Sequence, residues 1–390
     1  MRNSRKFKTI LLLAISICTW LGTADAVMAE WQRHEIRQGD GQGGWVTKPA
    51  KIQVIKQPDS VYTMPWGLVQ MDNGEVALIC SWERNSGQLP IIAFSKDDGN
   101  TWTDFDVVSD TPGRPQILTW HGGGNLSFVT TRRYYSFDYG RTWPENVEHP
   151  KTSTGMNFDI EGNAWVDRDA QGKAEAILEL GWHYEPGKRH PIDDATVVFR
   201  RSTDGGRSWQ DETSPPQWKF ISKHEGEEKL RGVSEGAIVR AQNGWLVAAL
   251  RTDVPLRYLT DSTIDHWEGT AISISKDDGK TWSDLNILFD AGRHHANLQR
   301  LPNGDLVCVM VVRGDIRDGK QASLRRGFDA LISHDNGLTW NLDRRIELDA
   351  FDNDEAKCGH IAVVVLDDGH VISGYGSYVK GATVLVKWKP

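Results

Sequence analysis

Cysteine is scarce in this sequence, with four residues in 390. Cys18 lies in the first segment, and Cys80, Cys308 and Cys358 are far apart along the chain. No two of them have the CxxC spacing of a zinc site, which excludes the common structural zinc modules. We therefore expect Cys80, Cys308 and Cys358 to be buried free thiols, with one disulfide among them as the alternative.

The sequence also lacks a hydrophobic run long enough to cross a membrane. Its longest run, TILLLAISICTWLG, follows a basic segment, MRNSRKFK, and leads to small residues at ADA (24–26) or VMA (27–29). This order is typical of a secretory signal, and the run is shorter than the roughly 20 residues of a spanning helix. We predict a signal peptide over 1–29, cleaved after Ala26 or Ala29, and a secreted or periplasmic protein with no membrane span after cleavage. A retained anchor helix is the alternative.

Positive charge is not in excess, and nucleotide motifs are missing. Residues 1–29 carry a net charge of +3, so the remainder of a chain of net charge −8 carries −11. A balance this negative argues against nucleic acid as a partner, and an acidic ligand must be held by a few placed cations. The sequence contains no P-loop and no dinucleotide-binding fingerprint, and no calcium-ligand loop is visible. We predict no cofactor.

An eight-residue pattern, Ser-x-Asp-x-Gly-x-Thr/Ser-Trp, is present five times. In such a pattern the Asp accepts hydrogen bonds from nearby backbone N–H groups, and the Gly supplies a positive φ. The Trp begins the next strand. Each residue type has a structural role, so we interpret these aspartates as parts of turns and not as catalytic groups. The five copies are SKDDGNTW at 95, SFDYGRTW at 136, STDGGRSW at 202, SKDDGKTW at 275 and SHDNGLTW at 333.

Apolar segments joined by tight turns precede most copies, as in GLVQMDNGEVALIC and GAIVRAQNGWLVAAL. Such pairs predict two-stranded hairpins, and each unit then has four strands, the size of a propeller blade. The last unit lacks the repeated turn and has three strands, and residues 50–58 can supply the fourth. We predict an all-β, six-bladed β-propeller with five of these turns, as a single domain over 30–390. The expected blades are 61–108, 113–150, 155–215, 228–288, 290–346 and 356–390.

The repeated turn resembles the Asp-box, or BNR, repeat of the sialidase superfamily, and the match spans nearly all of the chain after the signal. The resemblance implies a sialidase-like propeller. It is specific for the fold more than for activity, because proteins without enzymatic activity share the repeat.

Part of the family's site also has counterparts here. In blade 4 the resemblance implies a Glu followed by an Arg about 16 residues later, and SEGAIVRAQNGWLVAALR supplies Glu235 and Arg251. In blade 5 it implies an Arg before the repeated turn, which Arg325 or Arg326 supplies. Neighbouring strand residues face opposite ways, so only one of these two can face the site. Two such guanidinium groups would hold a carboxylate in bidentate fashion. A solvated acid and a surface charge pair are the alternatives.

Other positions depart from the family pattern. Thr63 stands where the family has the Arg of an Arg-Ile-Pro segment, and the loop after it offers Glu83 and Arg84 in place of an Asp. His360 stands where the family has its Tyr nucleophile. Imidazole can act as a base or an acid but does not replace that Tyr. Two tyrosines end the next strand and are further candidates for the axis: Tyr375 and Tyr378.

Further polar residues open the predicted inner strands or lie on the long blade 3 insertion. A lone His of this kind is more often structural than catalytic, and the neighbours His294 and His295 cannot both face the axis of a regular strand. This argues against a metal site. The candidates are Arg114, Asn157, Asp159, Arg293, His294, His295, Asn297, His183 and His190.

The sequence thus predicts a secreted enzyme that hydrolyses terminal, acidic sugars from an oligosaccharide or polysaccharide. A polysaccharide lyase acting on uronate-containing glycans and an inactive glycan-binding protein are alternatives, and a purely structural propeller is a third. The catalytic candidates are Glu235, His360, Glu83 and Asp159. The substrate-binding candidates are Arg251, Arg326, Arg325, Arg114, His295 and Tyr375.

Overall fold

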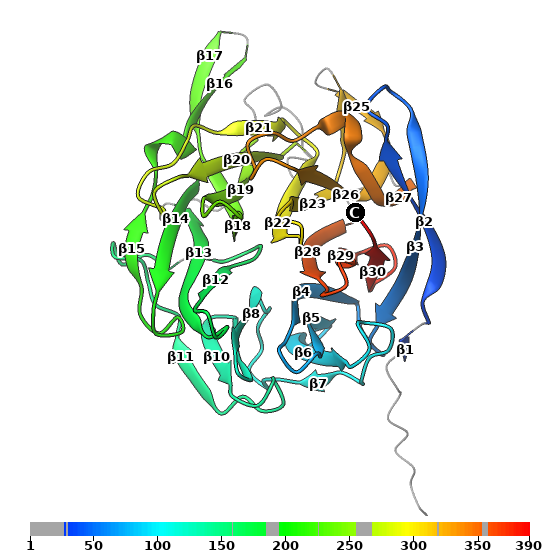
Figure 1. The fold of residues 1–390 in the computed structure, drawn as a ribbon, viewed down its shortest axis with the longest axis vertical. Coiled ribbons are helices and arrows are strands. Elements are labelled where there is room, and N and C mark those ends of the chain that lie inside the picture. Colours follow the sequence, from blue (N-terminus) through cyan, green and yellow to red (C-terminus); the bar gives the residue numbers. More distant parts are fainter. Residues whose placement is uncertain are drawn as a thin grey trace, which may run out of the picture.

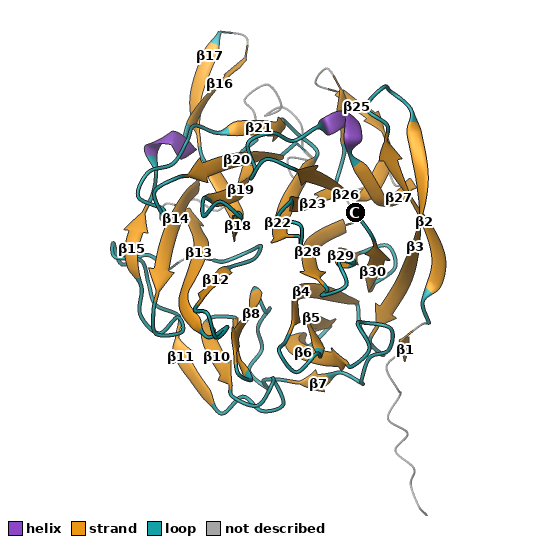
Figure 2. Ribbon diagram, in the orientation of Figure 1, coloured by secondary structure: helices purple, strands orange, loops and turns teal. Residues whose placement is uncertain are grey.

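The computed structural model describes residues 27–28, 30–157, 159–184, 195–224, 226–254, 267–317, 320–352 and 358–390. His190 and the predicted signal peptide, apart from Val27 and Met28, lie outside these residues. Strands make up most of the described structure, and the helices described are single turns, η1 (Pro216–Trp218) and η4 (Leu342–Arg344) (Figure 2). None of the helices in these ranges is both long and apolar enough to span a bilayer.

Four sheets of four strands each surround a common centre, with the first strand of each sheet innermost (Figure 1). The first sheet has β4 (Tyr62–Gln70), β5 (Val76–Arg84), β6 (Gly87–Ser95) and β7 (Asp106–Val107). The second has β8 (Ile117–Gly122), β9 (Asn125–Val129), β10 (Arg132–Ser136) and β11 (Glu145–Glu148). The third has β12 (Trp165–Arg168), β13 (Ala174–Tyr184), β14 (Ala195–Ser202) and β15 (Gln210–Thr213). The fourth has β18 (Val233–Arg240), β19 (Leu246–Thr252), β20 (Gly269–Ser275) and β21 (Asn286–Phe289).

A larger sheet completes the ring. Its strand order is β22-β23-β26-β27-β2-β3-β30-β29-β28, with β1 beside β3. Residues 51–55 of β3 pair with β30, which confirms that the N-terminal segment supplies a fourth strand to the last unit. The strands are β22 (Arg293–Arg300), β23 (Leu306–Val312), β26 (Arg325–Ser333), β27 (Ile346–Asp352), β1 (Val27–Met28), β2 (Gln32–Gly39), β3 (Trp45–Lys56), β28 (Cys358–Val365), β29 (Val371–Ser377) and β30 (Ala382–Trp388). Two hairpins lie outside these sheets: β16 (Phe220–His224) with β17 (Glu227–Arg231), and β24 (Asp315–Arg317) with β25 (Lys320–Ser323).

All five Ser-x-Asp-x-Gly turns have the same hydrogen bonds. In the turn after β20, Ser275 Oγ accepts from the backbone N–H of Gly279 at 2.8 Å. Asp277 accepts from the N–H of Thr281 at 2.8 Å and from its hydroxyl at 2.6 Å. The corresponding bonds in the other four turns are 2.6 to 2.9 Å long. The turn carboxylates are therefore occupied by their own backbone, as a structural role requires.

The core lies between neighbouring sheets. The run LVCVMVV of β23 is buried throughout, because one face packs on the fourth sheet and the other packs on β28, β29 and β30 from the opposite end of the large sheet. Cys80, Cys308 and Cys358 are buried in these layers and are free, so the expectation of free thiols is confirmed and the disulfide is not formed. Burial raises the pKa of Cys80 and of Cys308 to about 12.

Candidate functional site

Four inner strands carry a β-bulge at the same place. The extra residues are Trp66 in β4, Glu235 in β18, His295 in β22 and His360 in β28. Glu235, His295 and His360 have φ values of 34°, 52° and 47°. This left-handed backbone is uncommon outside glycine and costs energy, so it persists only where the surroundings enforce it, often at functional sites. The bulges also re-aim the side chains they carry.

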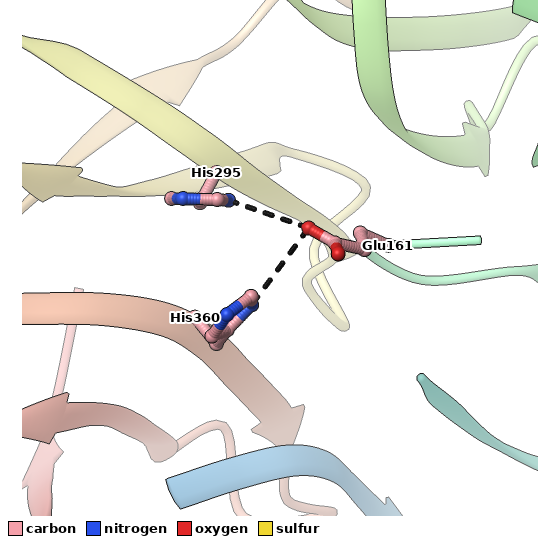
Figure 3. Close-up of side chains that lie close together, drawn as sticks. All are labelled: Glu161, His295 and His360. Atoms are coloured by element: carbon pink, nitrogen blue, oxygen red, sulfur yellow. Dashed lines mark ion pairs between the residues drawn. The ribbon is translucent and has the colours of Figure 1, made fainter. Parts of the chain in front are cut away.

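These bulge residues converge on Glu161, which precedes β12. We call Trp66, Glu161, Glu235, His295 and His360 the central cluster. They line one cavity of about 10 Å³, room for a single water. Figure 3 shows the Glu161 carboxylate reaching toward both imidazoles. Its Oε2 lies 3.8 Å from Nδ1 of His295 and 3.8 Å from Nδ1 of His360.

A second cavity adjoins the cluster and follows the inner strands toward their other ends. It has a volume of about 240 Å³ and shares Trp66 and Gly162 with the smaller cavity. Asn297 and Gln299 of β22 contribute amide groups to its wall. The cluster is thus next to a space of the size of a small ligand.

Glu235 is held by positive and polar neighbours. Its Oε1 lies 2.5 Å from Nη1 of Arg251, and its Oε2 contacts Nδ1 of His295. Arg251 also donates to Ser234 Oγ at 2.9 Å and lies 3.1 Å from Glu268. Burial opposes ionisation of Glu235, but the charge of Arg251 and the His295 contact outweigh it and hold the pKa well below 4.5. Glu235 is therefore an anion near neutral pH.

Glu161 and Glu268, two buried carboxyl groups near this pair, have pKa values shifted in the opposite direction. Burial, reinforced by the charge of Glu235, raises the pKa of Glu161 to about 7. Arg114 donates to Glu161 Oε1 at 2.7 Å, and Oε2 has no hydrogen-bond partner in the described structure. Burial likewise raises the pKa of Glu268 well above 4.5, although Arg251 opposes this rise. Glu161 can therefore hold a transferable proton near neutrality, and Glu268 keeps its proton to a higher pH than an ordinary carboxyl group.

His360 is set up as a neutral imidazole. Its ring packs on Trp66 with centroids 3.7 Å apart, and the centroid of His295 lies 4.9 Å away. Burial, together with the charge of the neighbouring Arg114, lowers the pKa of His360 well below 6.5. A neutral imidazole next to a protonated carboxyl group is suited to proton transfer.

The donor atoms of Glu161, His295 and His360 lie within 4.8 Å of one another, a spacing that a metal ion could bridge. Two guanidinium groups touch the same set, however. Arg114 pairs with Glu161, and Arg313 lies 3.2 Å from Nε2 of His295. Their charge disfavours a further cation, so the arrangement suits proton transfer better than metal binding.

The structure brings five of the sequence candidates together: Glu235, His295, His360, Arg251 and Arg114. Arg251 lies behind Glu235 and contacts its carboxylate, whereas Arg114 lies over the ring of Trp66 at 4.6 Å.

The structure places other candidates away from this cluster. Tyr375 is buried in the core and donates from its hydroxyl to Asp349 at 2.9 Å. Arg325 pairs with Asp329 within β26, and Arg326 donates to the backbone carbonyl of Arg325 at 2.9 Å. Arg325 thus belongs to a charged network inside its own sheet, and Arg326 is fully buried there.

The acids expected beside Glu235 are also elsewhere. Glu83 accepts from the side chain of Gln88, and Asp159 is exposed and accepts from Gln116 at 2.8 Å. Thr63 is buried and accepts from the N–H of Gln57 at 3.0 Å. The sequence placed the second acid at Glu83 or Asp159, whereas the structure offers Glu161.

Sequence reasoning missed Trp66, Glu161, Glu268 and Arg313. Glu161 lies two residues after the candidate Asp159, but spacing alone does not say which carboxylate turns inward. Arg313 follows the second strand of its unit, much as Arg251 ends the second strand of the unit before it. Aligning the units with one another could have found it.

No protein-family model matches the chain. A sequence relative, "Sialidase 85-1.1" of Trypanosoma cruzi, is 32% identical over 87 residues, which is 20% of this chain and 11% of that protein. The match thus spans about a tenth of the relative's length.

Solved structures match over much more of the chain. A protein of unknown function from Dyadobacter fermentans DSM 18053 has a TM-score of 0.63 and 17% identity, covering 86% of this chain and 97% of that one. Trypanosoma rangeli sialidase has a TM-score of 0.54 and 15% identity, covering 93% and 59%. The NanB sialidase of Streptococcus pneumoniae has a TM-score of 0.51 and 10% identity, covering 85% and 69%. The chain therefore shares its fold with these two sialidases.

Proposed function

We propose that this protein is a glycan-cleaving enzyme that hydrolyses acidic sugars, with Glu161 as the proton donor. One observation carries the proposal: two buried carboxyl groups of a single cluster have opposite ionisation preferences. The pKa of Glu161 is raised to about 7, and that of Glu235 is held well below 4.5. A protonated and an ionised carboxyl group side by side are the acid and the anion of glycoside hydrolysis.

In this reaction Glu161 protonates the glycosidic oxygen as the bond to the anomeric carbon breaks. Glu235, fixed by Arg251, stabilises the positive charge that develops on the sugar ring. Neutral His360 accepts a proton from the water that attacks the anomeric carbon. Arg114, whose side chain is 37% exposed, supplies positive charge toward an acidic sugar.

The fold supports a carbohydrate substrate, since sialidases are among its structural neighbours. We infer further that the two halves of the large sheet act as separate blades, giving six blades and five Asp-box turns. On this reading 30–390 form one domain, and 1–29 direct it to the periplasm or the exterior.

A lyase is the second candidate, favoured by the neutral state of His360. In that reaction His360 removes the proton at C5 of a uronate, Glu161 donates its proton to the leaving oxygen, and an unsaturated uronate forms. Arg114 would then face the substrate carboxylate.

A glycan panel separates these functions. Sialosides, uronate-containing polysaccharides and neutral glycans are incubated with the protein, and both reducing sugar and ultraviolet absorbance are followed. Reducing sugar without absorbance supports the hydrolase, and an absorbing product supports the lyase. No product with any glycan, despite retained binding, contradicts both and supports an inactive binding protein.

Matched variants connect the activity to the cluster. Glu161→Gln and His360→Gln should abolish product formation. Glu175→Gln and His334→Gln, which alter exposed residues far from the cluster, should leave it unchanged. Full activity of Glu161→Gln would remove the basis of the proposal.

A further inference from the structure

Arg313 follows β23 and is buried against the central cluster. Its Nη2 lies 3.2 Å from Nε2 of His295. A guanidinium group only donates hydrogen bonds, so Nε2 of His295 must be the acceptor. A neutral imidazole has one N–H, and here that hydrogen is left to Nδ1.

The other side of the ring agrees with this assignment. Nδ1 of His295 contacts Oε2 of Glu235, and an ionised carboxylate can only accept. Both contacts therefore require the same tautomer, with Nε2 bare and Nδ1 carrying the hydrogen. Arg251 holds the second oxygen of Glu235 at 2.5 Å, so a continuous series of contacts links Arg313 to Arg251.

We propose that Arg313 is a positioning residue that fixes His295 as its neutral Nδ1–H tautomer and so places the hydrogen-bearing nitrogen next to the Glu235 carboxylate. The proposal assigns different tasks to two similar imidazoles and rests on the proposed function only for its effect on catalysis. Nε2 of His295 is occupied by the hydrogen bond from Arg313. His295 then orients the anion, and proton transfer falls to Glu161 and His360.

The geometry of His360 fits this division. Its ring makes no hydrogen bond within the described residues, whereas both nitrogens of His295 are engaged. Glu161 Oε2 lies 3.8 Å from Nδ1 of both rings, so its distance does not distinguish His295 from His360. The hydrogen bond from Arg313, which only His295 receives among the described residues, does distinguish them. The charged and titratable groups around His295 are Glu161, Glu235, Arg251, His294, Arg313 and His360.

Nuclear magnetic resonance of protein labelled with nitrogen-15 at histidine tests the tautomer directly. The His295 signals are assigned by their loss in His295→Gln. In the wild type we expect hydrogen on Nδ1 and none on Nε2. In Arg313→Met, where no guanidinium group donates to Nε2, we expect hydrogen on Nε2 in a measurable fraction of the molecules. Hydrogen on Nε2 of the wild type, or an unchanged tautomer in Arg313→Met, would overturn the proposal.

Two further variants serve as controls, one that keeps a donor at position 313 and one that removes a buried guanidinium group from another sheet. Arg313→Lys retains a donor and should keep the wild-type tautomer. Arg200→Met removes a buried guanidinium that pairs with Glu179 in another sheet, so it reports the structural cost of such a loss without altering His295. If Arg313→Met does not fold, the wild-type and Arg313→Lys spectra still decide the question.

Activity is a separate readout. Arg313→Met should lower kcat about tenfold to a hundredfold, as loss of an outer hydrogen-bond partner commonly does, and should change the pH profile. The expected tautomer in a protein that cleaves none of the tested glycans would sustain the positioning role and reject the proposed function. The opposite pattern, activity with hydrogen on Nε2, would reject only the positioning role.

Discussion

Glu235 and His295 face each other across two neighbouring inner strands, and each occupies the left-handed position of a β-bulge. Residues held in this backbone region cost on the order of 1–3 kcal/mol each. Their contact is therefore made by two strained residues, and His360 adds a third from β28, at the opposite edge of the large sheet from β22. Folding alone does not need this arrangement, whereas a preorganised acid–base site does.

The ionisation of Glu161 should set the alkaline limit of activity. The pKa of Glu161 is raised to about 7, and a general acid works only while it is protonated. We expect kcat/KM to be high below this value and to fall about tenfold per pH unit above it. The measurement is a pH–rate profile on the best glycan from the panel. An activity that stays constant to pH 9 would mean that Glu161 is not the acid.

Two carboxyl groups, Glu235 and Glu268, contact Arg251, and replacing each of them by Gln should lower the stability of the protein by different amounts. Glu235 is an anion that neutralises the charge of Arg251. Glu235→Gln therefore leaves the buried Arg251 without its counter-ion and should lower the free energy of unfolding by about 3 kcal/mol. The raised pKa of Glu268 means that this group carries its charge less readily than Glu235, so Glu268→Gln should cost only about 1 kcal/mol. Urea unfolding at neutral pH measures both. Equal losses would contradict the assigned ionisation states.

The same pair predicts a pH dependence of stability. The folded state keeps the proton of Glu268 at pH values where the unfolded chain has lost it above 4.5. The folded state therefore binds more protons, and this group's contribution to stability falls as pH rises above 4.5. Glu268→Gln removes that contribution, so its stability should decline less between pH 5 and 8 than that of the wild type. A steeper decline in the variant would contradict the raised pKa.

The sequence allowed the fold to be predicted more fully than the site, and the reason is physical. The turn pattern depends on local hydrogen bonds such as those of Asp277, so it can be read from eight residues. The pairing of residues 51–55 with the last unit followed from counting strands. Glu235 and His360 were found because they begin inner strands. Glu161 was missed because a loop, not a strand period, turns its side chain inward.

The repeated turns should contribute to stability and not to catalysis. Ser275 is fully buried, accepts from Gly279 N–H and donates to Asp277. Ser275→Ala leaves that N–H without its partner, which should cost about 1–3 kcal/mol while kcat/KM stays at the wild-type value. Thermal unfolding and the glycan assay check the two parts. A loss of activity in fully folded Ser275→Ala would give the turn a role that its geometry does not suggest.

The three free thiols should be unreactive until the chain unfolds. Cys80, Cys308 and Cys358 are fully buried, and burial raises the pKa of Cys80 and Cys308 to about 12. The thiolate is the reactive form, so both the lack of access and the raised pKa slow modification. Titration with a thiol reagent at neutral pH should modify none of the three in the native protein and all of them in denaturant.

Because each thiol lies in a different strand, β5, β23 or β28, the rates at which they become reactive in intermediate urea compare the opening of three sheet regions. A single common rate would mean that these regions unfold together, whereas early reaction of Cys358 would show that β28, which carries His360, opens first. Rapid labelling of any of them without denaturant would contradict the packing described for its strand.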